Sequence, residues 1–409
     1  MESFSPEQAL YEVRREFGEH GGVTPSISRS ATFTVLDPRT MPEIFKGIRG
    51  PDQNGCFLYS RHFNPTVHVL DRYLAAMEDS EAAVCTASGM AAISCTLLQL
   101  CPSGAHIVSG DTIYGGSHAL LEQLLPELNI QTTFVDPADP AAFEAAIRPE
   151  TRVLYVETVA NPTLKVADIP KLSAIARAHN LTLVVDNTFT PMVVSPIRLG
   201  ADVVVYSLTK FINGASDLIA GAICASKEFI YRLMDLHTGR VMLLGPTLDP
   251  RCAFDIIQRL PHLALRMREH GARALALAEH LETLWVAVTY PGLASHPQRA
   301  LFDRLRNPGF GYGGIFTVDC ETRERADAFM ATLQNEERFG MIAVSLGYAD
   351  TLISCSGSST SSEIAPEAQQ RMGLSPGLVR ISMGYTGRME RRKAQIEGAA
   401  RAVGLLPEA

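Results

Sequence analysis

The chain has 409 residues and a formal net charge of −8, with 46% hydrophobic and 20% charged residues. This length and composition are typical of a globular protein with two domains, and the acidic balance gives no basic surface for nucleic acid or anionic lipid. No apolar run reaches the roughly 18 residues that a membrane-spanning helix needs, so we expect neither a nucleic-acid partner nor a membrane.

The eight cysteines are scattered along the chain and predict no bound metal. None forms a C-x-x-C pair, and no set of cysteines and histidines has the spacing of a zinc site. Cysteines in apolar runs without such patterns are typical of reduced, buried thiols. The first residues also lack the hydrophobic segment of a secretory signal. We therefore expect a cytoplasmic protein.

Residues 1–60 show no sustained periodicity and predict an extended N-terminal arm that lies on another surface. Tyr59 and Arg61 then lead into a helix that starts near Asn64, with Thr66 as its expected cap. An arginine beside a tyrosine before a helix is ordinarily part of a surface ion pair, and the local sequence leaves that interpretation open.

A short turn of Ser88, Gly89 and Met90 precedes a helical run at 91–100. Ser88 is a good helix cap, and Gly89 lets a ligand approach the backbone closely. The free amide groups at a helix start form an anion site. A plain helix cap with no ligand is the ordinary alternative.

Tyr114 lies after a predicted strand at 106–109 and directly before two glycines. The glycines add no side chains beside the backbone, so the tyrosine ring could lie flat on a bound cofactor. A tyrosine that simply packs in a loop would give the same local sequence.

Strands and helices then alternate along the chain. The pattern predicts strands at 132–135, 153–157, 181–185 and 203–206, and helices at 140–148 and 168–179. Such alternation implies right-handed crossovers and an α/β fold with a mostly parallel sheet. Asn161 follows the strand at 153–157, where capping of a helix is its ordinary use.

Two of these strands deliver chemically useful side chains. Asp186 follows the strand at 181–185, while Ser207, Thr209 and Lys210 follow the strand at 203–206. In open α/β sheets, ligands bind beyond the carboxyl ends of the strands, so these side chains should share one crevice. A lysine amine can form a Schiff base with pyridoxal 5'-phosphate (PLP), and an aspartate can keep the pyridine nitrogen protonated. Taken singly, each residue could instead be a turn cap or a solvated charge.

The pattern changes near 240–252, and we place the start of a smaller α+β domain there. Our domain prediction is an arm at 1–60, a PLP-binding α/β domain at 61–250 and a C-terminal domain at 251–409. The second domain is expected to contain a long helix at 253–284, a helix at 322–334, and strands at 285–290, 314–319, 342–345 and 378–382.

Arg380 lies within the apolar strand at 378–382, where an unpaired charge is costly. A guanidinium there can bind the carboxylate of a substrate through two hydrogen bonds, although a structural ion pair is also possible. The composition of the serine-rich run at 354–363 predicts a flexible polar loop.

Many ordered motifs, over residues 20–400, resemble the Cys/Met-metabolism (cystathionine γ-synthase-like) family of PLP-dependent enzymes. They are Y-S-R at 59–61, S-G-M at 88–90, Y-G-G at 114–116, E-T-x-x-N-P at 157–162, D-N-T at 186–188, S-L-T-K at 207–210 and V-R-I-S at 379–382. Stretches such as YSRHFNPT, MLLGPT and YPGLASHPQ are most similar to the plant-type branch of methionine γ-lyases. The resemblance implies the fold type I architecture and a dimer that usually pairs into a tetramer.

The resemblance also implies roles for individual residues. Lys210 would hold PLP covalently and move protons, Asp186 would pair with the pyridinium, and Tyr114 would stack on the ring and protonate the leaving sulfur. The phosphate would be held by Ser88, Gly89, Met90, Ser207 and Thr209, and by Tyr59 and Arg61 reaching across from a neighbouring subunit. Asn161 would lie near the phenolic oxygen of the ring. Arg380, helped by Ser345, would bind the carboxylate of an amino-acid substrate.

The reaction expected from this likeness is γ-elimination of L-methionine to methanethiol, 2-oxobutanoate and ammonia. Family members that act on cystathionine often carry carboxylates at the positions of Leu58 and Val344. An ammonium group against these apolar side chains would lose hydration without a partner, so a thioether substrate is favoured. Alternatives are a γ-replacement transferase acting on O-acetylhomoserine, a cystathionine lyase or synthase, and a PLP-binding protein without activity.

Two positions depart from the family pattern. Gly116 stands where many bacterial methionine γ-lyases have cysteine, and Ala215 stands where histidine is frequent. The sequence offers no physical account of the alanine.

Overall fold

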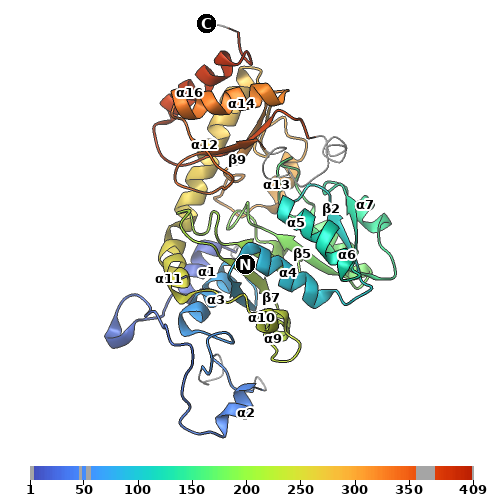
Figure 1. The fold of residues 1–409 in the computed structure, drawn as a ribbon. Helices are drawn as coiled ribbons and strands as arrows, with labels where there is room; N and C mark the ends of the chain where they lie inside the picture. The colour runs from blue at the N-terminus through green and yellow to red at the C-terminus, as the bar shows by residue number, and fades with distance from the viewer. Residues whose placement is uncertain (1–3, 46–47, 52–56, 356–373, 408–409) are drawn as a thin grey trace.

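The computed structural model describes residues 4–45, 48–51, 57–355 and 374–407, and it contains two separate sheets (Figure 1). The serine-rich run at 354–363 therefore lies outside the described residues from position 356 onward. No helix in the described ranges is long and apolar enough to cross a membrane.

The larger sheet has seven strands in the order β1-β7-β6-β5-β4-β2-β3. Its strands are β1 Ala82–Thr86, β2 His106–Gly110, β3 Gln131–Val135, β4 Thr151–Glu157, β5 Thr182–Asp186, β6 Val203–Ser207 and β7 Gly221–Ala225. The five strands from β3 to β6 run parallel, whereas β7 is antiparallel to both β6 and β1. This confirms the predicted, mostly parallel α/β fold. The prediction omitted β1 and β7.

Both faces of this sheet are buried, which explains the continuous apolar runs of its strands. Alternate residues point into two different cores, so that Val184 lies in one and its neighbours Leu183 and Val185 lie in the other. The helices of this part of the chain are α3 Pro65–Glu78, α4 Gly89–Leu100, α5 Gly115–Ala119, α6 Leu125–Glu127, α7 Pro140–Ala145, α8 Ile169–Ala178, α9 Lys227–Leu233 and α10 Arg240–Leu244, with a π-helical turn Leu120–Leu124 and a 3-10 turn Pro196–Leu199.

The N-terminal segment is not wholly extended. It contains α1 Pro6–Val13, a 3-10 turn Glu19–Gly21 and α2 Thr40–Phe45. Helix α1 forms because Ser5 caps it, and it buries Leu10 in the core beside α3. By contrast, α2 lies on a loop that projects away from the rest of the molecule (Figure 1). At the start of α3, the cap is Asn64 rather than Thr66, because Asn64 Oδ1 accepts from the amides of Thr66 and Val67.

The smaller sheet has the order β10-β11-β12-β9-β8. Its strands are β8 Val288–Thr289, β9 Ile315–Asp319, β10 Met341–Ile342, β11 Leu352–Cys355 and β12 Leu378–Ser382; the helices are α11 Pro250–Arg259, α12 Leu263–Thr283, α13 Arg299–Leu305, α14 Arg323–Ala331 and α16 Met389–Ala402, with a 3-10 turn Leu260–His262 and a π-helical turn Thr332–Glu336. The helix predicted at 253–284 is interrupted at Pro261, which has no amide hydrogen to donate.

Strand β10 ends at Ile342, so the strand predicted at 342–345 is wrong beyond its first residue. Ser345 consequently lies in the loop between β10 and β11. The predicted boundaries at 60/61 and 250/251 stay predictions.

Candidate active site

Three neighbouring parallel strands end in polar residues at one edge of the larger sheet. Glu157 ends β4, Asp186 ends β5 and Ser207 ends β6, and Glu157 pairs in register with Asp186. A cavity of about 230 Å³ opens at this edge. The predicted site residues that line it are Ser88, Gly89, Met90, Tyr114, Asn161, Asp186, Ser207, Thr209, Lys210, Val344 and Arg380.

Helix α4 starts against the end of β6, and we call the corner between them the anion-binding corner after the role that we expect of it. Ser88 Oγ accepts from the amide of Ala91 at 3.1 Å. The amides of Gly89 and Met90 come before it at the start of the helix, where no preceding turn supplies intrahelical acceptors. A Cβ on Gly89 would lie 2.7 Å from Ser207 Cβ, so only glycine permits this approach. Thr209 adds a hydroxyl at the same edge. The corner is suited to a phosphate, because amide and hydroxyl donors meet at a helix N-terminus.

Asp186 is buried at the floor of the cavity. Its Oδ1 accepts from the amide of Thr188 at 3.0 Å, and Thr188 Oγ1 accepts from the amide of Ser207 at 2.9 Å. Burial raises the pKa of Asp186 to about 6, although hydrogen bonds from Thr188 oppose the shift. A positively charged ring nitrogen facing this carboxylate would stabilise its ionised form.

Lys210 and Arg380 meet at Ser345. Lys210 Nζ donates to Ser345 Oγ at 3.1 Å, and Arg380 Nη2 donates to the Ser345 carbonyl at 3.3 Å. Burial, and then the charge of Arg380, lower the pKa of Lys210. An amine with a lowered pKa is more readily available as a nucleophile and base.

Arg380 is fully enclosed, with 2% of its surface exposed. Its Nη1 donates to Asn161 Oδ1 at 3.1 Å, whereas its Nε has no partner among the described residues. Burial lowers the pKa of Arg380 to about 10, so the group is still charged at neutral pH. Because a buried guanidinium with an unused donor is costly, this arrangement favours a carboxylate ligand.

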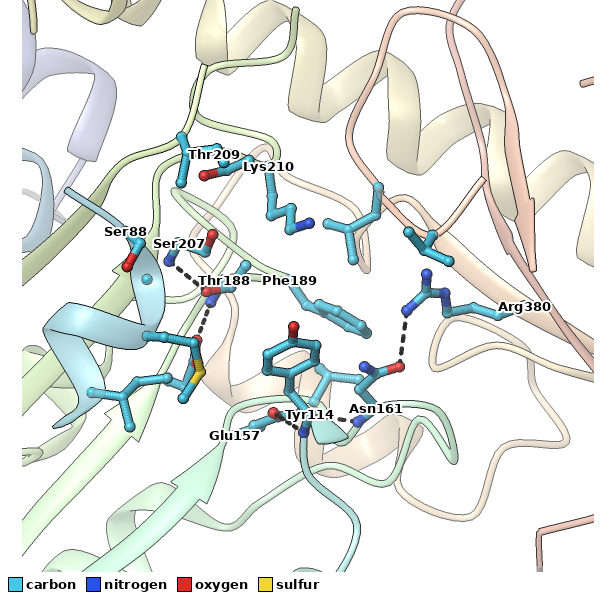
Figure 2. A pocket seen from close by; sticks show the side chains of 18 residues that line it. Ser88, Tyr114, Glu157, Asn161, Thr188, Phe189, Ser207, Thr209, Lys210 and Arg380 are labelled. Carbon is cyan, nitrogen blue, oxygen red and sulfur yellow. Dashed lines mark hydrogen bonds between the residues drawn. The ribbon is translucent and has the colours of Figure 1, made fainter. Parts of the chain in front are cut away.

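Lys210, Tyr114 and Arg380 point into the same cavity from three different segments (Figure 2). The Tyr114 side chain is 43% exposed in this chain. A Cβ at Gly116 would lie 2.6 Å from Cε1 of that ring, so the glycine leaves room for the ring position seen here. Nothing in the structure explains Ala215.

Several cavity residues were missed by the sequence predictions. They are Ile93, Glu157, Val159, Thr188, Phe189, Ile219 and Leu346. Glu157 could have been found, because it is an acidic residue at the carboxyl end of a predicted strand. Asp186 has the same position relative to the strand predicted at 181–185. The apolar residues carry no such signal, since nothing in their local sequence separates them from core residues.

Leu58, Tyr59 and Arg61 do not line the cavity of their own chain. Leu58 is buried, and Tyr59 is 46% exposed. Arg61 Nη1 donates to the Met242 carbonyl at 2.9 Å, and its guanidinium lies 5.4 Å from the centre of the Tyr59 ring. Their predicted contact with the cofactor of a neighbouring subunit stays a prediction.

Comparisons with known proteins agree with this geometry. The model of the Cys/Met metabolism PLP-dependent enzyme family matches residues 8–389. Methionine gamma-lyase of Arabidopsis thaliana is 55% identical over 396 residues, which are 96% of this chain and 90% of that protein. L-methionine gamma-lyase of Pseudomonas putida is 38% identical, with 90% of each chain covered.

A solved structure extends the likeness to the cofactor. A putative O-acetylhomoserine (thiol)-lyase of Campylobacter jejuni, which carries a pyridoxyl-lysine phosphate, has a TM-score of 0.88 and 25% identity and covers 97% of this chain and 99% of its own. The lysine amine, the buried aspartate and the anion-binding corner fit the aldehyde, ring nitrogen and phosphate of PLP. This chain belongs to the Cys/Met metabolism family of PLP-dependent enzymes, whose fold type I architecture it shares.

Proposed function

We propose that this protein is a carbon–sulfur lyase that converts L-methionine to methanethiol, 2-oxobutanoate and ammonia. The observation that carries the proposal is that the cavity has a positively charged part and an apolar part. Arg380 offers a buried positive charge for the amino-acid carboxylate, while Val344, Leu346 and Ile219 give the cavity an apolar part that suits a thioether. The 55% identity to the Arabidopsis methionine gamma-lyase supports the same substrate.

In this proposal the cavity residues hold the cofactor at three points. Lys210 Nζ holds it covalently, Asp186 faces the ring nitrogen, and the corner around Gly89 and Ser207 takes the phosphate. When bound, PLP supplies an electron sink that accepts negative charge from the substrate's Cα. The protein's own side chains then have to orient the substrate and move its protons.

Arg380 fixes the substrate carboxylate, which leaves the thioether to lie along the apolar part of the cavity. The substrate's amine takes the place of Lys210, and the freed Nζ would take the proton from Cα; its lowered pKa increases the unprotonated share of the amine. Tyr114, which points into the cavity between them, is the proposed proton donor to the departing sulfur (Figure 2).

We also propose a homodimer with shared sites that pairs into a tetramer, in which Tyr59 and Arg61 complete the phosphate site of a second copy. The projecting segment around α2 supports this assembly, because it exposes Leu36, Met41 and Phe45. A cytoplasmic location fits the seven cysteines within the described ranges, none of which forms a disulfide.

The proposed reaction is tested on the purified protein loaded with PLP. Methionine should yield 2-oxobutanoate and methanethiol in equal amounts, and Lys210→Ala should abolish both. Absence of the oxoacid with the native protein would overturn the assignment.

A γ-replacement transferase is the second candidate, and the likeness to the putative O-acetylhomoserine (thiol)-lyase favours it. Incubation with O-acetylhomoserine and sulfide separates the two functions. A lyase should release mainly 2-oxobutanoate, whereas a transferase should release mainly homocysteine.

The shared site is tested by mixing two inactive variants, Lys210→Ala and Arg61→Ala. A hybrid dimer contains one site with both native residues if Arg61 acts across the interface. Activity should therefore reappear after co-refolding, and a mixture that stays inactive contradicts the shared site.

A further inference from the structure

Glu157 joins two loops that come from different parts of the chain. Its Oε1 accepts from the amide of Tyr114 at 2.6 Å, and its Oε2 accepts from the amide of Asn161 at 3.0 Å (Figure 2). The carboxyl group is only 6% exposed and stands beside Asp186 on the next strand. Each oxygen of this one buried side chain is thus committed to the backbone of a different loop.

These two loops carry the groups that have to face each other across the cavity. One loop presents the Tyr114 ring. The other presents Asn161, whose side-chain Oδ1 receives Nη1 of Arg380 at 3.1 Å. A continuous chain of hydrogen bonds therefore runs from Tyr114 through Glu157 and Asn161 to Arg380.

We propose that Glu157 is a positioning residue for the reaction, which sets the placement of the Tyr114 ring relative to the carboxylate-binding Arg380. It does so without touching the reacting atoms, by accepting one backbone amide from each loop. The inference rests on the proposed function only for the choice of substrate.

The alternative is that Glu157 merely completes the buried hydrogen bonding of the fold. The two possibilities differ in what a glutamine would do. Glutamine keeps the shape and one acceptor oxygen, but it turns an NH2 group toward one of the two backbone amides, so donor faces donor. One loop is then released while the rest of the buried shape is kept.

Glu157→Gln is therefore the informative variant, with Glu78→Gln as its matched control. Glu78 is also fully buried and also accepts a backbone amide, that of Ile197, but it does not line the cavity. In Glu157→Gln we expect bound PLP to be retained and kcat/KM for methionine to fall about 10- to 100-fold, the range for leaving one buried amide donor without an acceptor. Glu78→Gln should keep native kinetics.

The decisive measurement is the circular dichroism of the cofactor's visible absorption band, recorded without substrate. That signal reports the asymmetric surroundings of the ring, so it should change in Glu157→Gln and stay native in Glu78→Gln. Because no substrate is present, a wrong substrate assignment leaves this measurement valid.

Asn161→Ala tests the link to Arg380 separately. It removes that hydrogen bond but keeps the backbone amide that binds Glu157, so KM for methionine should rise. If Glu157→Gln does not fold, Glu157→Asp takes its place, because the shorter side chain keeps the carboxyl group but cannot reach both amides. Native dichroism together with native kcat/KM in the folded Glu157 variant would overturn the proposal.

Discussion

Gly89 gives the sharpest test of the anion-binding corner. A Cβ at this position would lie 2.7 Å from Ser207 Cβ and 3.0 Å from both Cα and Oγ of the same residue. Such contacts are too short to persist, so Gly89→Ala has to push the start of α4 away from the end of β6. This movement widens the corner that we expect to hold the phosphate.

The magnitude follows from the usual cost of overpacking, about 1–3 kcal/mol. Because the displaced groups are the ones that we propose bind the cofactor, the strain should appear in its affinity. At about 1.4 kcal/mol for each factor of ten, PLP should bind roughly 5- to 150-fold more weakly. Titration of the cofactor-free protein with PLP, followed by absorbance, measures the effect.

Gly271→Ala is the matched control, because a Cβ there meets its nearest neighbours at an ordinary 3.6 Å. Gly271 lies inside α12, where alanine is the better helix former by about 1 kcal/mol. This variant should bind PLP normally. If Gly89→Ala also binds PLP with native affinity, the corner between α4 and β6 does not hold the phosphate.

Three further predictions concern binding, pH and substrate choice. Arg380→Lys keeps the charge but loses the paired donors, so KM for methionine should rise about 10- to 100-fold in steady-state kinetics; an unchanged KM would exclude Arg380 as the carboxylate site. Burial raises the pKa of Glu78 from 4.5 to about 8, so the folded chain keeps a proton that the unfolded chain releases in this range. The contribution of Glu78 to the free energy of unfolding should therefore fall as the pH rises from 4.5 to 8. Urea unfolding of the native protein and of Glu78→Gln across this range should show that the stability difference between them changes in this direction. Val344→Glu places a carboxylate where Val344 is 69% exposed beside the cavity. It should raise kcat/KM for cystathionine relative to methionine, and an unchanged ratio would show that this position does not select the substrate.

The convergence of Asp186 and Lys210 was predictable because it depends on short-range patterns. Short β-branched runs define parallel strands, and side chains after neighbouring strands meet at one edge. Arg380 was likewise predictable, since a charge in an apolar strand needs a partner or a ligand.

Other features depend on contacts that the local sequence does not encode. Strand β7 has the sequence GAICA, which carries no sign that it inserts antiparallel between β1 and β6. The role proposed for Glu157 depends on the amide of Tyr114, which is 43 residues away in the chain. The apolar residues Ile219 and Leu346 reach the cavity only because the two sheets bring their loops together.

The closeness of Arg380 to Lys210 has a consequence for the timing of proton transfer. The guanidinium charge helps to hold the lysine pKa down while no anion is bound. A substrate carboxylate seated on Arg380 would cancel much of that charge, and the amine would then become a stronger base. Arrival of the correct substrate would thus itself increase the proton affinity of the group that has to deprotonate it, and a ligand without a carboxylate would leave that group a weaker base.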